Sequence, residues 1–269
     1  MGRKNRFRVY YDANLKDSSP YFFGNTYVKK SICRIENTLS VVKGKINGSS
    51  VLDIGASPFY FLYRCQMEGA KKTAGVFYSE DNHVLRKEKT AYTSFGEIDL
   101  AHINVLKEPL PYPDDSFDIV GAMEIFEHFP EFPFHLLSEI TRVTKKQGLF
   151  FITVPNACRV ANVAKPILKK NVFMKYRNDP FGRHAHEYTR QQAVDLLRES
   201  VKGINSHALP IFKRVLVRNE LFRKAATVAP FTDYLAPIWC CSAELQGTLT
   251  PNEIRAPSSL YDRARSVEL

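Results

Sequence analysis

The regular alternation of short apolar runs with helix-length segments constrains the fold of this chain more than any other feature of its sequence. Runs of strand length are predicted to form buried strands at 51–54, 73–78, 98–105, 117–123, 149–154 and 236–243. Helix-length segments lie between them, and the segment 26–43 carries its apolar residues on one helical stripe. Strands that alternate with helices favour a mostly parallel sheet with helices on both faces. We therefore predict an α/β, doubly wound sheet that binds ligands at the carboxyl ends of its strands.

Several helix ends are marked by local chemistry. Pro133 suits the first turn of a helix that we expect to run to about Lys145, and Gly148 is expected to end it. Thr189 and Gln192 have the spacing of a capping box, so a helix is predicted to begin at Thr189.

The 269 residues suffice for one substantial core rather than two full domains. We predict an N-terminal helical segment over 1–47 and one folded domain over 48–245. A basic insertion at about 157–188 is expected to act as a lid on this domain. From about residue 246 the chain becomes polar and contains two prolines, so 246–269 is expected to be a loose tail.

The formal net charge of +10 bears on binding partners more than on fold. Basic residues are concentrated between Arg159 and Arg190, and again between Lys213 and Lys224. A solvated surface explains such clusters, and so does attraction of a phosphorylated acceptor, an anionic membrane surface or nucleic acid. Charge alone leaves these alternatives open.

Two further patterns concern the compartment. The apolar runs are too short to span a bilayer, and the first residues are basic and then polar, unlike a signal peptide. The five cysteines are odd in number and lack metal-type spacing, so we interpret them as reduced thiols. A cytoplasmic protein without a transmembrane segment is expected.

The first loop of the predicted sheet, DIGASPFYF (53–61), follows a strand and opens a helix. Gly55 allows a ligand to approach the backbone, and Asp53 can accept a hydrogen bond from a ligand ammonium group. Ser57 is expected to cap the helix, with Pro58 in its first turn. Phe59 stands where a pyrophosphate cradle requires glycine, which favours a cofactor without phosphate. S-adenosylmethionine fits this description.

Three longer motifs have residues and spacings that resemble those of one known protein family. They are HINVLKEPLPYPDDSFDIVGAMEIFEH (102–128), SEITRVTKKQGLFFITVPN (138–156) and GRHAHEYT (182–189). Over about residues 48–200 the chain resembles class I S-adenosylmethionine-dependent methyltransferases of the type 11 kind. The third motif is similar to that of members found with cell-surface glycan and lipid biosynthesis. The resemblance implies a Rossmann-like sheet of seven strands and S-adenosylmethionine as the cofactor.

The resemblance also implies cofactor-binding residues. Those expected at the methionine end, the adenine and the ribose are Asp53, Gly55, Ala56, Asn104, Val105, Met123 and Glu124. The Asn104 amide would read the edge of the adenine. The alternative for this asparagine is a turn residue that hydrogen-bonds its own backbone.

One position departs from the family pattern. Class I enzymes usually have an acidic residue at the end of the second strand, where it binds the ribose hydroxyls, and here that position is Phe77. Glu80, or else Asp81, is the candidate to reach back to the ribose. Otherwise the ribose is held differently, or the chain is a weak or inactive relative.

Candidate catalytic residues come from the last two motifs. A hydroxyl acceptor requires a base, and imidazole titrates near neutrality. We select His128 and His184, with Glu187 as an orienting group or an alternative base; a hydrogen-bonded structural histidine is the competing interpretation of each. His186 falls at a variable position of the motif. A metal site from His184 and His186 lacks further ligands, so no metal is expected.

Together these features predict O-methylation of a sugar, a glycan-lipid or another anionic small-molecule acceptor, with membrane-surface contact through the basic clusters. Two alternatives remain. One is an RNA methyltransferase, favoured by charge but disfavoured because no RNA-binding module or aromatic-rich basic platform is evident. The other is an inactive scaffold with the same fold, which Phe77 favours.

Overall fold

The computed structural model describes residues 26–56, 59–78, 90–172, 183–211 and 232–260. Within these residues the chain forms an eight-stranded sheet with the order β3-β4-β2-β1-β5-β6-β8-β7. The strands are β1 (Ser50–Ile54), β2 (Lys72–Phe77), β3 (Thr90–Thr93), β4 (Gly96–His102), β5 (Phe117–Met123), β6 (Thr144–Pro155), β7 (Ile204–Ile211) and β8 (Ile238–Glu244). The five central strands from β4 to β6 are parallel, whereas β3, β8 and β7 join antiparallel.

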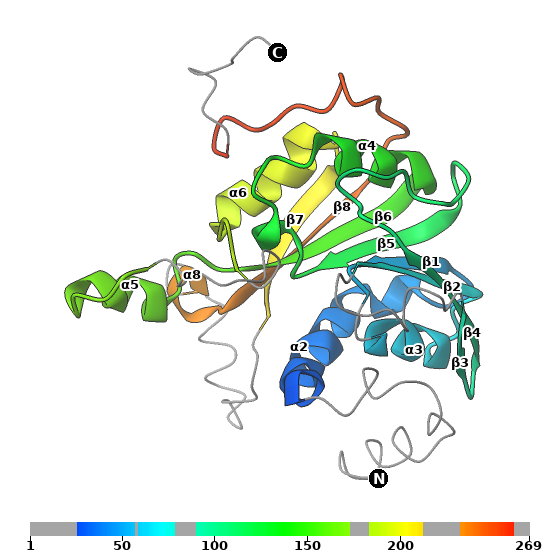
Figure 1. Ribbon diagram of the computed structural model, residues 1–269, viewed down its shortest axis with the longest axis horizontal. Coiled ribbons are helices and arrows are strands. Elements are labelled where there is room, and N and C mark those ends of the chain that lie inside the picture. The colour runs from blue at the N-terminus through cyan, green and yellow to red at the C-terminus, as the bar shows by residue number, and fades with distance from the viewer. Residues whose placement is uncertain (1–25, 57–58, 79–89, 173–182, 212–231, 261–269) are drawn as a thin grey trace.

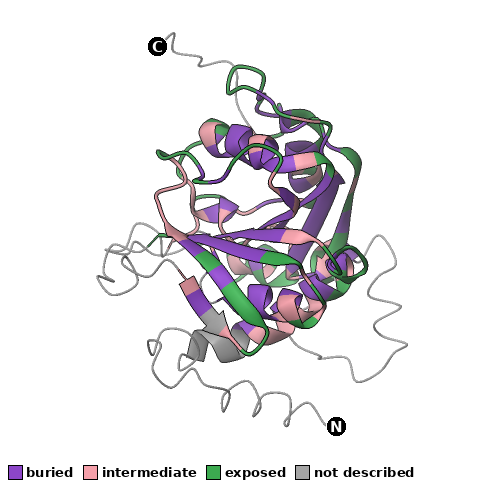
Figure 2. Ribbon diagram, turned by 90° about the vertical axis from the view of Figure 1, so that its right-hand side faces the viewer, coloured by how far each residue is buried: buried purple, intermediate pink, exposed green. Residues whose placement is uncertain are grey.

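Helices cover both faces of the sheet (Figure 1), and most of the sheet between them is buried (Figure 2). The α-helices are α2 (Thr26–Val42), α3 (Tyr60–Met67), α4 (Phe134–Val143), α5 (Val160–Ile167), α6 (Arg190–Asp195) and α8 (Thr232–Leu235). Shorter helical turns are η1 (Lys43–Lys45), η3 (Phe126–His128) and η5 (Leu196–Ser200). Helices α2 and α3 lie on one face, and α4 and α6 lie on the other. Each face has its own cluster of buried apolar side chains.

The predicted α/β, Rossmann-like sheet is confirmed, with eight strands in place of seven. The two strands that no predicted apolar run covers, β3 and β7, form the two edges of the sheet. Both are weak sequence signals, since β3 has only four residues and β7 contains Pro210 and is exposed at several positions. Edge strands bury little apolar surface, so their residues lack the continuous apolar runs of the central strands.

The helix boundaries agree with the local signals in one case and differ in another. The capping box at the start of α6 is present, with the Gln192 backbone N–H donating to Thr189 Oγ1 at 3.2 Å. Pro133 is the N-cap of α4 rather than its first residue, and the helix ends at Val143. Gly148 therefore lies inside β6, where Phe117 pairs with Thr144 but Ile119 pairs with Leu149. This change of register is a bulge in the strand. Glycine suits the position because an added Cβ would lie 2.7 Å from the Lys145 carbonyl oxygen.

The expectation of a loose tail from residue 246 is wrong for residues 246–260. Leu249 and Ile254 are buried in the apolar cluster on the α4 side of the sheet. The Ser138 hydroxyl on α4 donates to the Leu249 carbonyl oxygen at 2.8 Å, and Gln192 on α6 donates to the Ser259 carbonyl oxygen at 2.7 Å. A few scattered apolar side chains, together with these hydrogen bonds, anchor an otherwise polar segment. Residues 261–269 lie outside the described part.

None of the helices in the described ranges has the length and apolar character needed to cross a membrane.

Candidate active site

Two acidic residues lie at the carboxyl ends of the neighbouring parallel strands β1 and β5. Asp53 is 2% exposed, and its Oδ1 atom has no hydrogen-bond partner among the described residues. Burial raises the pKa of Asp53 well above its ordinary value, against the opposing positive charge of Arg34. Glu124 follows β5 directly and has a positive φ of 55°. Its Oε1 atom is also buried without a hydrogen-bond partner in the described residues.

Arg34 brings a cation from α2 to these two strand ends. Its guanidinium lies 2.9 Å from Glu124 Oε2, and each side chain is 9% exposed. Arg34 is not among the residues that the sequence motifs predicted for this site. It falls within the predicted amphipathic helix at 26–43, where one arginine beside the apolar stripe is usually a surface residue. Only the position of the helix over the strand ends distinguishes it.

The first loop turns tightly between β1 and the end of β2. The N–H groups of Gly55 and Ala56 both donate to the Val76 carbonyl oxygen, at 2.9 and 3.0 Å. Gly55 has φ of +79°, and a Cβ at this position would lie 2.2 Å from Ile125 Cγ2. Glycine is therefore required by both conformation and space. The predicted residues Gly55 and Ala56 follow the end of β1 directly, two and three positions after Asp53.

The predicted helix cap in this loop falls on residues that are not described. Ser57 and Pro58 lie outside the described residues, and α3 begins after Phe59 without a side-chain cap.

Two predicted residues beyond β4 have a local structural role. Asn104 Oδ1 accepts a hydrogen bond from the Leu106 N–H at 3.1 Å, and the Asn104 N–H donates to Glu108 Oε1 at 2.7 Å. The turn alternative for this asparagine is therefore present in the structure. Val105 is partly buried against the core. Met123, the last residue of β5, packs partly buried against the cluster on the α2 and α3 face.

Phe77 ends β2 with an aromatic ring rather than a carboxylate. The ring is 3% exposed, and its centroid lies 5.5 Å from that of Phe59 and 5.3 Å from that of His102. It belongs to the apolar cluster on the α3 face and offers no hydrogen bond to a ribose. Glu80, the candidate to replace it, lies outside the described residues.

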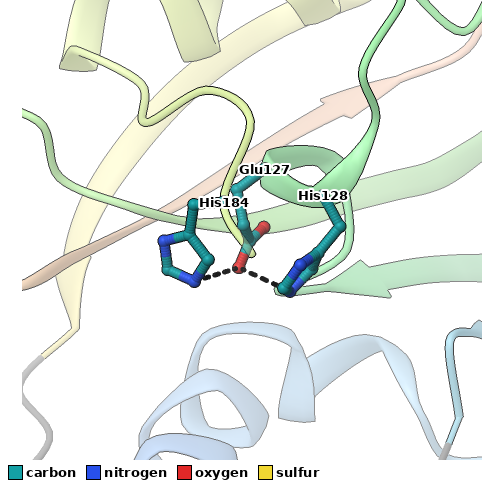
Figure 3. A group of neighbouring side chains, drawn as sticks. All are labelled: Glu127, His128 and His184. Atoms are coloured by element: carbon teal, nitrogen blue, oxygen red, sulfur yellow. Dashed lines mark ion pairs between the residues drawn. The ribbon is translucent and has the colours of Figure 1, made fainter. Parts of the chain in front are cut away.

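Three titratable side chains meet just beyond β5 (Figure 3). Glu127 and His128 lie on η3, and His184 lies on the loop before α6. Glu127 Oε1 is 3.8 Å from His128 Nε2 and 4.0 Å from His184 Nε2, and Glu127 is 1% exposed. The loop of His184 is attached to η3, because the N–H groups of Ala185 and His186 donate to the Glu127 carbonyl oxygen at 2.6 and 3.2 Å.

The opposite nitrogen of each imidazole also has a partner. His128 Nδ1 lies 3.1 Å from the Arg183 carbonyl oxygen, and His184 Nδ1 lies 3.1 Å from Glu187 Oε1. Glu187 also receives hydrogen bonds from Asn162 at 2.5 Å and from Arg159 at 3.3 Å. Burial acts to raise the pKa of Glu187, but these hydrogen bonds and the Arg159 charge outweigh it, so that pKa lies below its usual value.

The structure thus brings the predicted catalytic residues His128, His184 and Glu187 together, within one cluster. Glu127 belongs to the same cluster and was not selected. The signal for it was present, because it stands beside His128 in the Glu-x-x-Glu-His part of the 102–128 motif. The sequence motif assigned cofactor binding to Glu124, the other acid of this pattern, and gave no role to Glu127. No local pattern shows which of two such acids turns toward a histidine located 57 residues later.

Comparison with known proteins bears on this arrangement. Residues 52–152 match the family described as methyltransferase domain. The 27-O-demethylrifamycin SV methyltransferase of Amycolatopsis mediterranei (strain S699) is 25% identical over 185 residues, which are 66% of this chain and 65% of that protein. The chain spans between half and two thirds of the length of the curated relatives that it matches.

Two solved structures are similar to the whole fold. A SAM-dependent methyltransferase from Archaeoglobus fulgidus is 19% identical with a TM-score of 0.52, covering 84% of this chain and 96% of that one. Phosphoethanolamine N-methyltransferase 1 of Haemonchus contortus, solved with phosphoethanolamine and S-adenosylhomocysteine, is 12% identical with a TM-score of 0.54. It covers 93% of this chain and 50% of that one. Residues 52–152 therefore match a methyltransferase domain, and the fold of the described residues is that of solved S-adenosylmethionine-dependent methyltransferases.

Proposed function

We propose that this chain transfers a methyl group from S-adenosylmethionine to a hydroxyl oxygen of a sugar, a glycan-lipid or another anionic small molecule. The observation that carries the proposal is the cluster of His128, His184 and Glu127 immediately beyond Glu124 at the end of β5. The cofactor supplies a methyl group on a sulfonium and leaves as S-adenosylhomocysteine.

Asp53 is suited to bind the ammonium group of the cofactor's methionine end. A buried carboxylate with an unsatisfied oxygen gains strongly from a cationic partner. Arg34, close to Asp53 and paired with Glu124, is suited to bind the carboxylate of the same amino-acid moiety. The described residues therefore fit this end of the cofactor, while the ribose end departs from the usual pattern at Phe77.

His184 is suited to remove the proton from the acceptor hydroxyl. In the proposed step the O–H proton passes to His184 Nε2, and the oxygen electron pair forms the new O–C bond as the S–C bond breaks. Glu187 accepts a hydrogen bond from the Nδ1–H group and so holds the ring in the tautomer that leaves Nε2 as the proton acceptor. The relative named 27-O-demethylrifamycin SV methyltransferase supports oxygen as the methylated atom.

The surface of α5 supports an acceptor that is lipid-linked and anionic. Val160, Val163 and Ile167 are 53%, 46% and 78% exposed, and Figure 1 shows that this helix extends away from the sheet. Lysines 165, 169 and 170 follow on the same segment. Apolar side chains beside lysines are typical of helices at an anionic membrane surface.

The same helix is connected to the cluster. Arg159, its N-cap, and Asn162, in its first turn, both bind Glu187. Arg159 is thus partly neutralised, so the net charge of the predicted 159–190 basic segment overstates what an acceptor meets. The second predicted cluster, between Lys213 and Lys224, lies outside the described residues.

Methyl transfer can be assayed with labelled S-adenosylmethionine against nucleotide sugars, glycan-lipids in vesicles and RNA. We expect incorporation into a carbohydrate-containing acceptor, with loss of most turnover in His184→Ala and Asp53→Ala. His207→Ala is the matched control, because His207 lies on the edge strand β7 and contacts Ser242. Unchanged turnover in the first two variants would refute the site, and methylation of RNA alone would replace the acceptor class.

Isothermal calorimetry distinguishes an enzyme from an inactive scaffold. We expect saturable binding of S-adenosylmethionine in the micromolar range by the wild type and at least ~10-fold weaker binding by Asp53→Ala, since one charge-assisted hydrogen bond contributes about 1.5–3 kcal/mol. A chain that binds no cofactor at millimolar concentration is the scaffold instead.

A further inference from the structure

The atoms that face one another in the Glu127, His128 and His184 cluster are all electron-pair donors. A carbonyl oxygen only accepts hydrogen bonds, so His128 Nδ1, 3.1 Å from the Arg183 carbonyl oxygen, carries a proton. His184 Nδ1 donates in the same way to the Glu187 carboxylate. In the neutral rings, each Nε2 therefore presents a lone pair, and both face Glu127 Oε1 (Figure 3).

Two lone pairs and a buried carboxylate oxygen repel each other unless positive charge lies between them. Protons on both imidazoles would supply it, and so would one metal cation. The surroundings favour the cation. Metal-binding histidines typically donate their second nitrogen to a carboxylate or a backbone carbonyl, which fixes the tautomer and the ring orientation. Both kinds of partner occur here, with Glu187 on His184 and the Arg183 carbonyl on His128.

We propose that Glu127, His128 and His184 form a binding site for one divalent transition-metal cation. Two imidazoles with one carboxylate suit zinc, cobalt, iron or manganese better than calcium or magnesium, which prefer oxygen ligands throughout. The three ligand atoms lie within 4.8 Å of one another. Around an ion with bonds of about 2.0–2.2 Å, ligand atoms are roughly 3–4 Å apart, so the side chains need to close by about an ångström.

The cluster is built to hold this set in place. Glu127 and His128 are adjacent on η3, and the loop that carries His184 is hydrogen-bonded to the backbone of Glu127 through Ala185 and His186. The imidazole ring centroids are 5.1 Å apart, and the rings are nearly perpendicular, at 86°. Only three protein ligands are available among the described residues, which leaves coordination positions open to a water molecule or a substrate oxygen.

The open coordination positions give the cation a role in methyl transfer, and this part of the inference rests on the proposed function. A hydroxyl oxygen of the acceptor that binds the cation loses its proton to solvent more readily, because the positive charge stabilises the oxyanion. With a cation bound, His184 Nε2 would be one of its ligands, and the cation would supply the activation of the acceptor that the cation-free imidazole supplies in the proposed function. An acceptor with two neighbouring oxygen atoms could occupy two open positions of the cation, so the enzyme would prefer acceptors with vicinal or otherwise chelating oxygen atoms.

Cobalt is the most direct probe, because Co²⁺ bound by nitrogen and oxygen ligands absorbs visible light. We would titrate Co²⁺ into tag-free, chelator-treated protein without S-adenosylmethionine or acceptor, and then displace it with Zn²⁺. One equivalent is expected to bind, and His184→Ala and His128→Ala are each expected to weaken binding at least ~10-fold. Glu187→Gln should weaken binding about 10-fold through the orientation of His184.

Controls separate this site from general metal binding by histidines. The variants His186→Ala and His207→Ala should bind Co²⁺ as the wild type does, because neither histidine belongs to the proposed ligand set. The side chain of His184 is 25% exposed, so its removal should leave the circular dichroism spectrum unchanged, whereas a variant of the buried Glu127 is less certain to fold. No uptake of Co²⁺ or Zn²⁺ at 1 mM, or equal uptake by wild type, His128→Ala and His184→Ala, would overturn the inference.

The titration also separates this inference from the proposed function. Specific cobalt binding by a protein that methylates no acceptor would support the cation site while the proposed function fails. If the protein binds no cobalt and its methyl transfer is undiminished in the presence of a chelator, the cation site is overturned and His184 remains the base.

Discussion

The guanidinium of Arg34 lies 2.9 Å from the carboxylate of Glu124, and both side chains are 9% exposed. This ion pair joins α2 to the end of β5 across the site that we assign to the cofactor's methionine end. Removing one partner of a buried pair leaves the other charge uncompensated, which typically costs about 3–5 kcal/mol. We therefore expect Arg34→Met to lower the free energy of unfolding by about 3 kcal/mol in urea denaturation.

The matched control is Arg64, which pairs with Glu36 in a more exposed setting, at 11% and 36% for the two side chains. Arg64→Met should cost about 1 kcal/mol, because water solvates the remaining carboxylate. The double variant Arg34→Met, Glu124→Leu should recover most of the loss. Equal costs for the two arginines, or no recovery, would contradict the buried pair.

Asp53 is expected to make the unliganded protein less stable near neutral pH. Burial makes its pKa higher in the folded chain than in the unfolded chain, so folding is favoured while the carboxyl is protonated. That contribution is present below the unfolded pKa and is lost as the pH rises through the folded pKa. Asp53→Asn should therefore raise the free energy of unfolding at pH 7 by about 1 kcal/mol, and change it little at pH 4.

Asp118 should give stability the opposite pH dependence from Asp53. Although burial acts to raise its pKa, hydrogen bonds from Lys145 and the Ser50 N–H outweigh it and lower the pKa. Its contribution to stability is present above the unfolded pKa and is lost as the pH falls through the folded pKa. Asp118→Asn should thus reduce stability at pH 7, by less than about 1 kcal/mol because the pair is exposed. Thermal melts of both variants at pH 4 and pH 7 test the two signs together.

Gly55→Ala should damage both folding and cofactor binding. The substitution forces an L side chain into φ of +79° and places its Cβ 2.2 Å from Ile125 Cγ2. Strain and overpacking together are expected to cost about 2–4 kcal/mol. Gly44→Ala is the control, since nothing lies within 4 Å of its Cβ position and η1 accepts alanine. Denaturation curves that rank the two variants equally would exclude the tight turn as the cause.

Glu187→Gln should separate catalysis from cofactor binding. Loss of the carboxylate removes the group that orients His184 Nδ1, so we expect kcat to fall about 100-fold. The dissociation constant of S-adenosylmethionine, measured by calorimetry, should stay within about twofold, because Glu187 contacts none of the residues at the ends of β1 and β5 that we assign to the cofactor. A parallel loss of cofactor affinity would show that Glu187 supports the fold of the whole site.

Ile254→Ala should show that residues 246–260 belong to the folded domain. The side chain is 4% exposed within the apolar cluster beneath α4, and truncation of such a residue typically costs about 2–5 kcal/mol. Leu209→Ala, on edge strand β7 and 40% exposed, should cost less than about 1 kcal/mol. Urea unfolding in which Ile254→Ala is no more harmful than Leu209→Ala would mean that the segment is loosely attached.

Local patterns predicted the central sheet well. The strands β1, β2, β5 and β6 each bury a run of apolar side chains, and such runs are visible in any window of a few residues. The capping box of Thr189 and Gln192 was predictable for the same reason, because both of its hydrogen bonds join residues three positions apart. The edge strands β3 and β7 bury less, and they were missed.

The site residues divide in the same way. Asp53 and Gly55 could be selected because they lie at the end of a buried strand and in the loop that follows it, where the neighbouring residues indicate their role. Asn104 could not be decided, since its side chain serves a turn through Leu106 and the sequence is equally compatible with either role. The structure of residues 246–260 was misjudged because a few scattered buried apolar side chains do not produce a periodic pattern.

The sequence by itself determined the fold class, the order of the buried strands with the helices between them, and the residues at the end of β1, because each depends on interactions over a few positions. Only the tertiary structure decided which distant groups meet: Arg34 reaches Glu124, and His184 reaches Glu127, across 90 and 57 positions. Such contacts depend on the path of the chain between parallel strands. Many paths satisfy the same local pattern, and the packing of the two helical layers on the sheet selects one of them.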